Sequence, residues 1–230
     1  MAKNTHLEHL EDDIVNQGKA GGLNAIKMLR ELGKMLSEPN SSIRVTTKWD
    51  GAPAIVCGTD PITGYFFVGT KSVFNKTTPK IMYTQKQISD SYGNQPAVAK
   101  ILSYCLEYFP LLGISGVVQG DFLFTSESKS RKVIGGEECI SFQPNTITYA
   151  VPTGTPMAKM VEKAKIGIVF HTRYSGDSLS EMNAIFSVPT INSTDDVAVF
   201  SSTFTDASDC LLYTSPSPRD LSTSRMPSSA

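Results

Sequence analysis

Lys48 is followed by a tryptophan, an aspartate and a glycine, and this Lys-Trp-Asp-Gly run separates two β-prone segments, 43–47 and 54–57. A lysine held by sheet backbone at the rim of a tight turn is well placed to act as a fixed nucleophile. To attack phosphorus, a lysine must be deprotonated; its reference pKa is about 10.4, and partial burial or a neighbouring cation lowers that value. The same position also suits an ordinary solvated lysine, so residues elsewhere in the chain must decide between the two interpretations.

Asp121 is the second residue in an unexpected place, because it lies in the middle of the strongly β-prone run 116–124. Aspartate is depleted in strands and is costly when it is buried without a partner. Strand alternation puts Gln119 and Asp121 on one face and Val118 and Phe122 on the other. A hydrogen-bonded structural aspartate and a site carboxylate both fit this position.

Hydrophobic periodicity and turn residues predict the elements that must position these side chains. Helices are expected over 5–17, 23–36, 85–92, 96–109 and 156–165, and strands over 43–47, 54–57, 65–70, 116–124, 146–151 and 166–170. Lys71 follows one of these strands directly, and the polar, glycine-broken residues 125–139 predict an exposed hairpin. Two helices followed by strands with single helices between them indicate an α+β fold built on antiparallel sheet.

The composition indicates a globular protein of a reducing compartment, the cytoplasm. The 230 residues are 40% hydrophobic and 19% charged, and the net charge of −1 means that any basic groove must be local. No apolar run approaches the roughly 18 residues that a membrane span needs, so no membrane partner is expected. Cys57, Cys105, Cys139 and Cys210 have no metal-binding spacing, and three of them lie in strand or helix patterns, where a role as small core residues fits best. We expect a monomer.

The Lys-x-Asp-Gly run at 48–51 resembles the active-site motif of the covalent nucleotidyltransferases, which include ATP-dependent DNA ligases, RNA ligases and mRNA capping enzymes. That family places a basic residue after the motif, and Lys71 matches it. A Gly-Glu on a strand follows, and Gly120-Asp121 resembles it at a spacing of 121 − 48 = 73 residues from the lysine. The run Thr-Lys-Trp-Asp-Gly-Ala-Pro-Ala is also similar to ligase-like proteins of tailed bacteriophages. The resemblance covers about residues 43–175.

The resemblance implies an antiparallel-sheet nucleotidyltransferase domain, an ATP-grasp-like ligase fold, that uses ATP and Mg²⁺. By resemblance, Lys48 attacks the α-phosphate of ATP, and the lysyl-AMP then passes its AMP to the 5′-phosphate of a DNA or RNA end for sealing. Asp121 would contact the ribose, and Tyr149 or Phe170 would stack on the adenine. The remaining nucleotide-binding residues implied are Thr46, Thr47, Asp50, Gly51 and Lys71. A phage protein of this kind would act in the host cytoplasm.

Three features differ from the family pattern. The family carries glutamate at the position where this chain has Asp121. The family also often carries an acidic residue shortly before the nucleophile, where this chain has Thr46 and Thr47. Because that acidic residue reads adenine, the preference of this chain for adenine stays open. The run 165–169 resembles the family's fourth motif without its glutamate, and we favour 166–170 as the strand that carries the stacking aromatic. No lysine follows residue 165, so the family's closing Lys-x-Lys is absent.

We expect three regions: an N-terminal helical segment over 1–40, an incomplete nucleotidyltransferase-like domain over 41–209, and a disordered, non-native tail over 210–230. The tail is rich in serine and proline and has no periodicity. The natural chain is therefore expected to continue past about residue 209 with other residues, and the fragment to be inactive.

Three functions remain open on the sequence alone. The chain is a polynucleotide ligase domain, a catalytically degenerate relative that binds nucleotide or nucleic acid, or a phage structural or interaction protein. Under the first two, Lys48, Lys71, Asp121 and an aromatic residue should line one pocket on one sheet face. Under the third, local hydrogen bonds should occupy Asp121 far from Lys48.

Overall fold

The computed structural model describes residues 10–37, 47–185, 188, 190–202 and 213–214. The chain divides into two compact units, Met1–Thr47 and Lys48–Ala230. The division therefore falls directly before Lys48, whereas the sequence predicted a boundary after residue 40. Within the described residues, no helix combines the length and the apolar character that crossing a bilayer requires.

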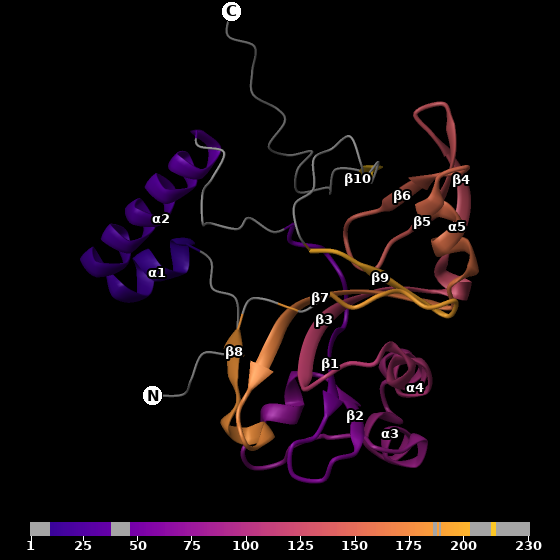
Figure 1. Ribbon diagram of the computed structural model, residues 1–230, viewed down its shortest axis with the longest axis horizontal. Helices are drawn as coiled ribbons and strands as arrows, with labels where there is room; N and C mark the ends of the chain where they lie inside the picture. Colours follow the sequence, from indigo (N-terminus) through magenta and orange to yellow (C-terminus); the bar gives the residue numbers. More distant parts are fainter. Residues whose placement is uncertain (1–9, 38–46, 186–187, 189, 203–212, 215–230) are drawn as a thin grey trace, which may run out of the picture. The chain divides into compact units, whose positions relative to one another are not determined.

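The first unit is a helical hairpin of α1 (Leu10–Gln17) and α2 (Lys19–Ser37), as the sequence predicted for most of this range (Figure 1). Acidic residues fill the first turn of α1, where they interact favourably with the helix dipole. The helices approach closely at Gly21, where a Cβ would lie 1.9 Å from the carbonyl oxygen of Asp13. Asn24 donates to the same aspartate through a 2.7 Å hydrogen bond. The predicted start of α1 at residue 5 lies outside the described residues.

The second unit is built on a principal sheet in which the strand order is β2-β1-β3-β7-β8, with β9 also paired to β7. The strands are β1 (Ala54–Thr59), β2 (Phe66–Gly69), β3 (Val117–Thr125), β7 (Ile166–Ser175), β8 (Asn183–Ile185) and β9 (Val197–Phe200). Every pairing is antiparallel except that of β7 with β9. The α+β prediction with antiparallel sheet is therefore confirmed, while β8 and β9 were not predicted.

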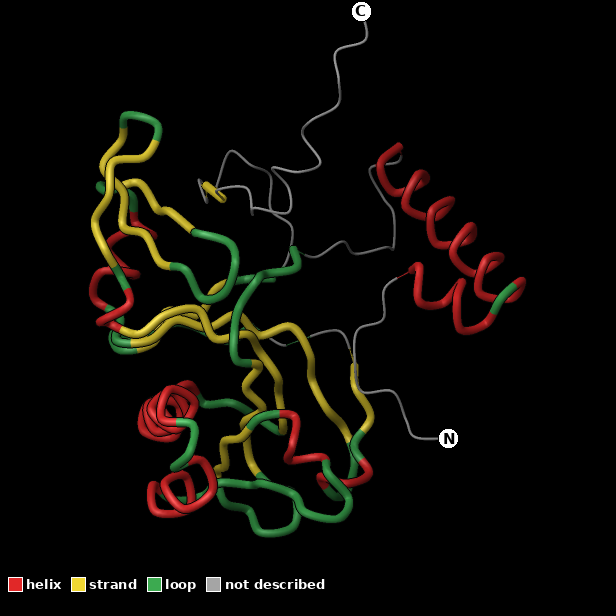
Figure 2. Tube along the Cα trace, turned by 180° about the vertical axis from the view of Figure 1, so that it is seen from behind, coloured by secondary structure: helices red, strands yellow, loops and turns green. Residues whose placement is uncertain are grey.

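One face of this sheet is covered by α3 (Gln85–Tyr92) and α4 (Pro96–Tyr108), which lie side by side in Figures 1 and 2. Thr84 begins α3 with a capping box, and Pro96 occupies the first turn of α4 as expected. The helices bury Ile88 and Leu102 against the apolar side chains of β1, β3 and β7. The opposite face carries two further buried clusters, one shared with the second sheet and one that includes Val56, Phe67 and Val117.

A second sheet has the order β10-β6-β5-β4 and packs with α5 (Pro156–Lys163). Its strands are β4 (Ser130–Ile134), β5 (Glu137–Phe142), β6 (Tyr149–Pro152) and β10 (Tyr213–Thr214). The β4–β5 hairpin confirms the one predicted within 125–139, and it turns through Gly135 and Gly136 at φ of 62° and 88°. Residues 213–214, which belong to the segment expected to be a disordered tail, pair with β6.

Candidate functional site

Lys48 lies in an irregular segment that leads into β1, and its side chain is exposed to solvent. Thr47, the residue before it, is also exposed and belongs to the irregular segment. Thr46 lies outside the described residues, as do residues 43–45 of the predicted strand. The partners of β1 are β2 and β3. The Lys-Trp-Asp-Gly run is therefore the entry to β1 rather than the tip of a hairpin made with 43–47.

Trp49 fixes the segment from the inside of the molecule, since its side chain is only 6% exposed. Its ring stacks on Tyr149 of β6 with centroids 4.9 Å apart and an interplanar angle of 29°. Phe200 of β9 lies 5.2 Å away on a tilted plane, and the indole N–H donates to the carbonyl oxygen of Ser201 at 3.3 Å. The residue directly after Lys48 is therefore anchored between the two sheets.

Asp50 ties the same segment to the loop before β6. Its carboxylate accepts hydrogen bonds from the Asn145 side chain at 2.8 Å and from the backbone N–H groups of Thr146 and Ile147 at 2.7 and 2.9 Å. The Asp50 N–H donates to the Tyr149 hydroxyl at 2.7 Å. The backbone N–H groups of Thr146 and Ile147 donate to the Asp50 carboxylate and not to a neighbouring strand. The strand β6 accordingly begins at Tyr149, whereas the sequence predicted a start at Thr146. Protein donors thus occupy Asp50, which the resemblance had assigned to the nucleotide.

Gly51 brings the segment against β3. A Cβ here would lie 2.5 Å from the Asp121 Cβ and 2.9 Å from the Phe122 carbonyl oxygen, so only glycine fits without a shift. Backbone bonds hold this approach: the Ala52 N–H donates to the Phe122 oxygen at 3.0 Å, and the Phe122 N–H donates to the Pro53 oxygen at 3.1 Å. The backbone that carries Lys48 therefore touches Asp121 three positions later.

Asp121 is near two more of the expected residues, Lys71 and Tyr149. Lys71 begins the short helix η1 (Lys71–Phe74) after β2; partial burial lowers the pKa of its ammonium group, and the nearby Asp121 carboxylate opposes that shift. Burial raises the pKa of the Tyr149 hydroxyl, the hydrogen bond from Asp50 opposes the rise, and the carboxylates of Asp50 and Asp121 add to it. Lys71 and the Tyr149 hydroxyl therefore both lie within electrostatic range of the Asp121 carboxylate.

The His171 side chain also reaches the Asp121 carboxylate, and the sequence did not predict this contact. In the β3–β7 ladder Gln119 pairs with Thr172 and Gly120 pairs with Phe170, so His171 is the extra residue of a β-bulge. Its Nε2 lies 3.5 Å from Asp121 Oδ1, and its Nδ1 lies 2.7 Å from Thr172 Oγ1. A bulge re-aims a side chain, and here it turns the histidine toward the centre of the candidate site.

A comparison with protein-family models matches residues 4–224 to a family of unknown function, DUF6267. The chain belongs to this family. The match extends through residues 210–224, which form most of the segment expected to be a non-native tail. No curated protein and no solved structure matches the chain.

Phe170 of this DUF6267 protein lies away from the Asp121 cluster. It packs edge-to-face on Phe109 and shares the helix-covered core with Val118 and Phe122. Asp121 is the neighbour of Phe122 in a regular stretch of β3, so its side chain points to the opposite face. The structure therefore puts the two residues on different sides of the principal sheet.

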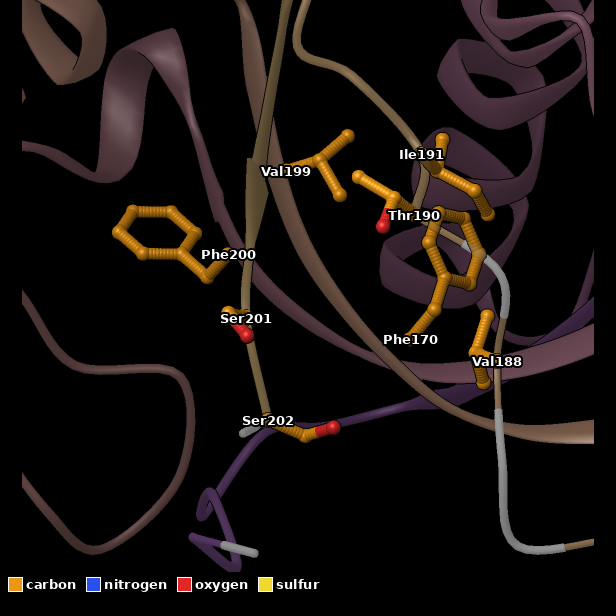
Figure 3. Close-up of a pocket in the computed structure, with 8 residues that line it drawn as sticks. All are labelled: Phe170, Val188, Thr190, Ile191, Val199, Phe200, Ser201 and Ser202. Atoms are coloured by element: carbon orange, nitrogen blue, oxygen red, sulfur yellow. The ribbon is translucent and has the colours of Figure 1, made fainter. Parts of the chain in front are cut away.

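The Phe170 ring lines a separate pocket of about 160 Å³ beside β9. Figure 3 shows Phe170, Val199 and Ile191 converging there while Phe200 points to the other side of the strand. Val188, Thr190, Ser201 and Ser202 complete the lining. Tyr149, the other aromatic candidate, stacks between Trp49 and Phe142, so both faces of its ring are covered. Stacking of a base on Phe170 stays a prediction, and Tyr149 serves the packing of the segment.

The described residues do not form a protein-made metal site. No group of three or more histidine, cysteine, aspartate or glutamate side chains gathers among them in a way that could hold an ion. Asp50, the carboxylate nearest Lys48 in sequence, already accepts three hydrogen bonds. Magnesium in nucleotide sites takes many of its ligands from phosphates and water.

The Asp50 carboxylate makes a pH-dependent contribution to stability. Burial alone would raise its pKa, but the hydrogen bonds from Ile147, Asn145 and Thr146 together hold that pKa below its ordinary value. A lowered pKa stabilises the fold above the unfolded value of about 3.9, and this stabilisation is lost as the pH falls through the lower folded value.

Replacing Asp50 with asparagine should lower the free energy of unfolding by about 2 kcal/mol at neutral pH, because an amide cannot accept all three donors. The difference between the two proteins should shrink as the pH is lowered below about 4, because Asp50 of the unfolded chain binds a proton there while the folded carboxylate stays ionised to lower pH. Urea denaturation followed by circular dichroism at a series of pH values measures it. If the difference in the free energy of unfolding stays constant over this pH range, the charge of Asp50 does not contribute to stability.

Proposed function

We propose that this protein is a covalent nucleotidyltransferase in which Lys48 accepts AMP from ATP and the AMP is then passed to a nucleic-acid 5′-phosphate end. One observation carries the proposal: the Lys-x-Asp-Gly segment lies against Asp121, and Lys71 lies beside the same carboxylate. The aromatic residue expected with them is not part of this group, because Phe170 faces the helix-covered core and Tyr149 stacks on Trp49 and Phe142. Asp121 is 73 residues from Lys48 in the sequence, so chain connectivity alone does not bring them together.

The charge of the site favours an anionic ligand. Two lysines belong to the proposed site, and Asp121 acts electrostatically on one of them, Lys71, whereas Asp50 is occupied by the loop before β6. We propose that a triphosphate meets both lysine side chains, of which Lys48 is exposed and Lys71 is half-buried. Lysine ammonium groups are common phosphate ligands.

The first chemical step forms one bond and breaks one. The unprotonated Lys48 Nζ attacks the α-phosphorus, the new P–N bond forms, and the bond from that phosphorus to the bridging oxygen breaks, releasing pyrophosphate. The nitrogen loses a proton to solvent. In the second step an oxygen of a nucleic-acid 5′-phosphate attacks the same phosphorus and restores the lysine. A 3′-hydroxyl of the adjoining strand then displaces AMP, which joins the ends.

The other residues of the site hold Lys48 in place for this reaction. Trp49 and Asp50 bind the segment to the second sheet, and Gly51 allows it to touch β3. Holding a nucleophile in one geometry lowers the entropic part of the barrier. Asp121 is proposed to accept a hydrogen bond from the nucleotide ribose, and Lys71 to bind phosphate oxygens. These roles follow the family resemblance, with aspartate in place of glutamate.

Two reagents test the proposal and separate transfer from simple binding. The first is each nucleoside triphosphate labelled at its α-phosphate, supplied with magnesium chloride. The second is an acyl-phosphate derivative of ATP, which acylates any lysine close to bound phosphates and needs no catalysis by the protein. Peptide mapping by mass spectrometry then identifies the modified lysine. The family match includes residues 210–224, which removes the reason to expect an inactive fragment. We therefore expect an acid-labile AMP adduct on Lys48 with ATP, and acylation of Lys48 that unlabelled ATP prevents.

The outcomes distinguish the candidate functions. Acylation of Lys48 without an AMP adduct would favour a relative that binds nucleotide and does not transfer it. An AMP adduct on another lysine would remove Lys48 as the nucleophile. Absence of both products would contradict a nucleotide site and favour a structural or interaction role.

A further inference from the structure

We propose that His171 is a positioning residue that orients Asp121 toward a nucleotide ribose and thereby sets a preference for ribonucleotides over deoxyribonucleotides. The inference rests on the proposed function, because it concerns the ligand of the same site. It adds a residue that the Lys-x-Asp-Gly resemblance does not supply.

The backbone of β7 is shaped to bring this side chain to Asp121. Before the bulge, Ile168 and Phe170 face the helix-covered core; after it, Tyr174 packs with Val117 and Phe74 on the opposite face. The side-chain alternation of the strand is therefore reversed at His171, and its ring lies near Asp121. The side chains of His171 and Asp121 are 18% and 20% exposed, so the pair is partly covered and still open to a ligand.

Thr172 is placed to select which ring nitrogen of His171 carries the proton. Its side chain is buried, with 2% exposed, and its Oγ1 lies 2.7 Å from His171 Nδ1. When the threonine hydroxyl donates to Nδ1, the proton of the neutral ring must lie on Nε2, the nitrogen that faces Asp121. The ring then presents a donor to the carboxylate whether it is neutral or protonated.

The two carboxylate oxygens of Asp121 have different proposed partners, His171 for Oδ1 and a ligand hydroxyl for Oδ2. Oδ1 lies 3.5 Å from the His171 donor, a separation that can shorten when a ligand closes the site. Holding Oδ1 fixes the rotation of the carboxylate and leaves Oδ2 to accept a hydrogen bond from a hydroxyl. Aspartate is one methylene shorter than glutamate, so its carboxylate lies closer to the sheet, where a side chain on the neighbouring strand can reach it. A ribose hydroxyl supplies the bond, and a deoxyribose does not.

The test compares nucleotide binding in a Lys48→Ala parent, where covalent transfer cannot interfere. Isothermal titration calorimetry measures the Kd values for ATP, 2′-deoxyATP and 3′-deoxyATP. The parent should prefer ATP over one of the deoxynucleotides by roughly 10- to 100-fold, the size expected for a hydrogen bond to a charged group. His171→Ala should reduce this preference to less than about 3-fold by weakening ATP alone. His171→Gln, whose amide can donate from a similar position, should restore much of it.

Thr172→Val provides a second variant, because it keeps the buried shape and removes only the hydroxyl that selects the tautomer. It should lower the preference in the same direction as His171→Ala. An unchanged preference in His171→Ala, or an equal loss of affinity for all three nucleotides, would overturn the positioning role. Failure of the parent to bind any nucleotide would overturn this inference together with the nucleotide site. A ribose preference that depends on His171, found in a protein that never forms the AMP adduct, would uphold the inference and contradict only the covalent step.

Discussion

Replacing Lys48 with alanine should lower the transfer of AMP from ATP to the protein by at least about 10³-fold, as expected when a covalent nucleophile is removed. The amine supplies the atom that bonds to phosphorus, and no neighbouring group can reproduce its position. Because the Lys48 side chain is exposed, the same change should alter the free energy of unfolding by no more than about 0.5 kcal/mol. Labelling with α-phosphate-labelled ATP and urea denaturation measure the two effects.

Lys76 provides a matched control, since it is another exposed lysine in the second unit and has no place in the proposed site. Lys76→Ala should label like the wild-type chain. Lys48→Arg should be as inactive as Lys48→Ala, because arginine keeps the positive charge but stays protonated. Full labelling of either Lys48 variant would exclude this residue as the nucleophile.

Replacing Trp49 with alanine should lower the free energy of unfolding by about 3–5 kcal/mol, the range seen when a buried tryptophan is truncated. The change removes the stack on Tyr149, the contact with Phe200 and the hydrogen bond to Ser201. It should also weaken labelling of Lys48, which loses its anchored neighbour. Far-ultraviolet circular dichroism in urea measures the stability, because the chain's only tryptophan is lost as a fluorescent probe.

Trp49→Phe is the control for this prediction. Phenylalanine keeps a ring between Tyr149 and Phe200 and removes the indole N–H, so the cost should be smaller than for alanine by at least about 1 kcal/mol. Equal effects of the two substitutions would mean that the stack does not contribute. A cost below about 1 kcal/mol for alanine would show that the ring is not part of the core.

Local patterns predicted the elements around the site because each element carries its own apolar face. The helix α4 was expected from the spacing of residues such as Leu102 and Cys105, which the structure buries completely. The strand β3 was expected from its alternation, and Asp121 attracted notice because it interrupts an apolar environment. Lys71 was found because it follows a predicted strand directly.

The contacts that define the candidate site depend on register and on distant chain segments, so local patterns did not predict them. Asp50 was expected to serve a nucleotide, yet its partners are 95 to 97 residues away in the loop before β6. The contact of His171 with Asp121 was not predicted, because only the pairing of β7 with β3 creates the bulge at that residue. Phe170 was expected to join the site, but the same pairing puts its ring on the helix-covered face. The strand β9 was missed because its parallel pairing with β7 has no local signature.

The segment that carries Lys48 has a mechanical consequence. Asp50 attaches it to the second sheet and Trp49 lies between the two sheets, whereas Gly51 touches β3 and the residues after it are hydrogen-bonded to that strand. The attachment therefore passes from one sheet to the other within three residues of the exposed lysine. A rotation of one sheet against the other would act on this segment, and Lys48 would move with it. A ligand that draws the sheets together would thus reposition the lysine without touching it.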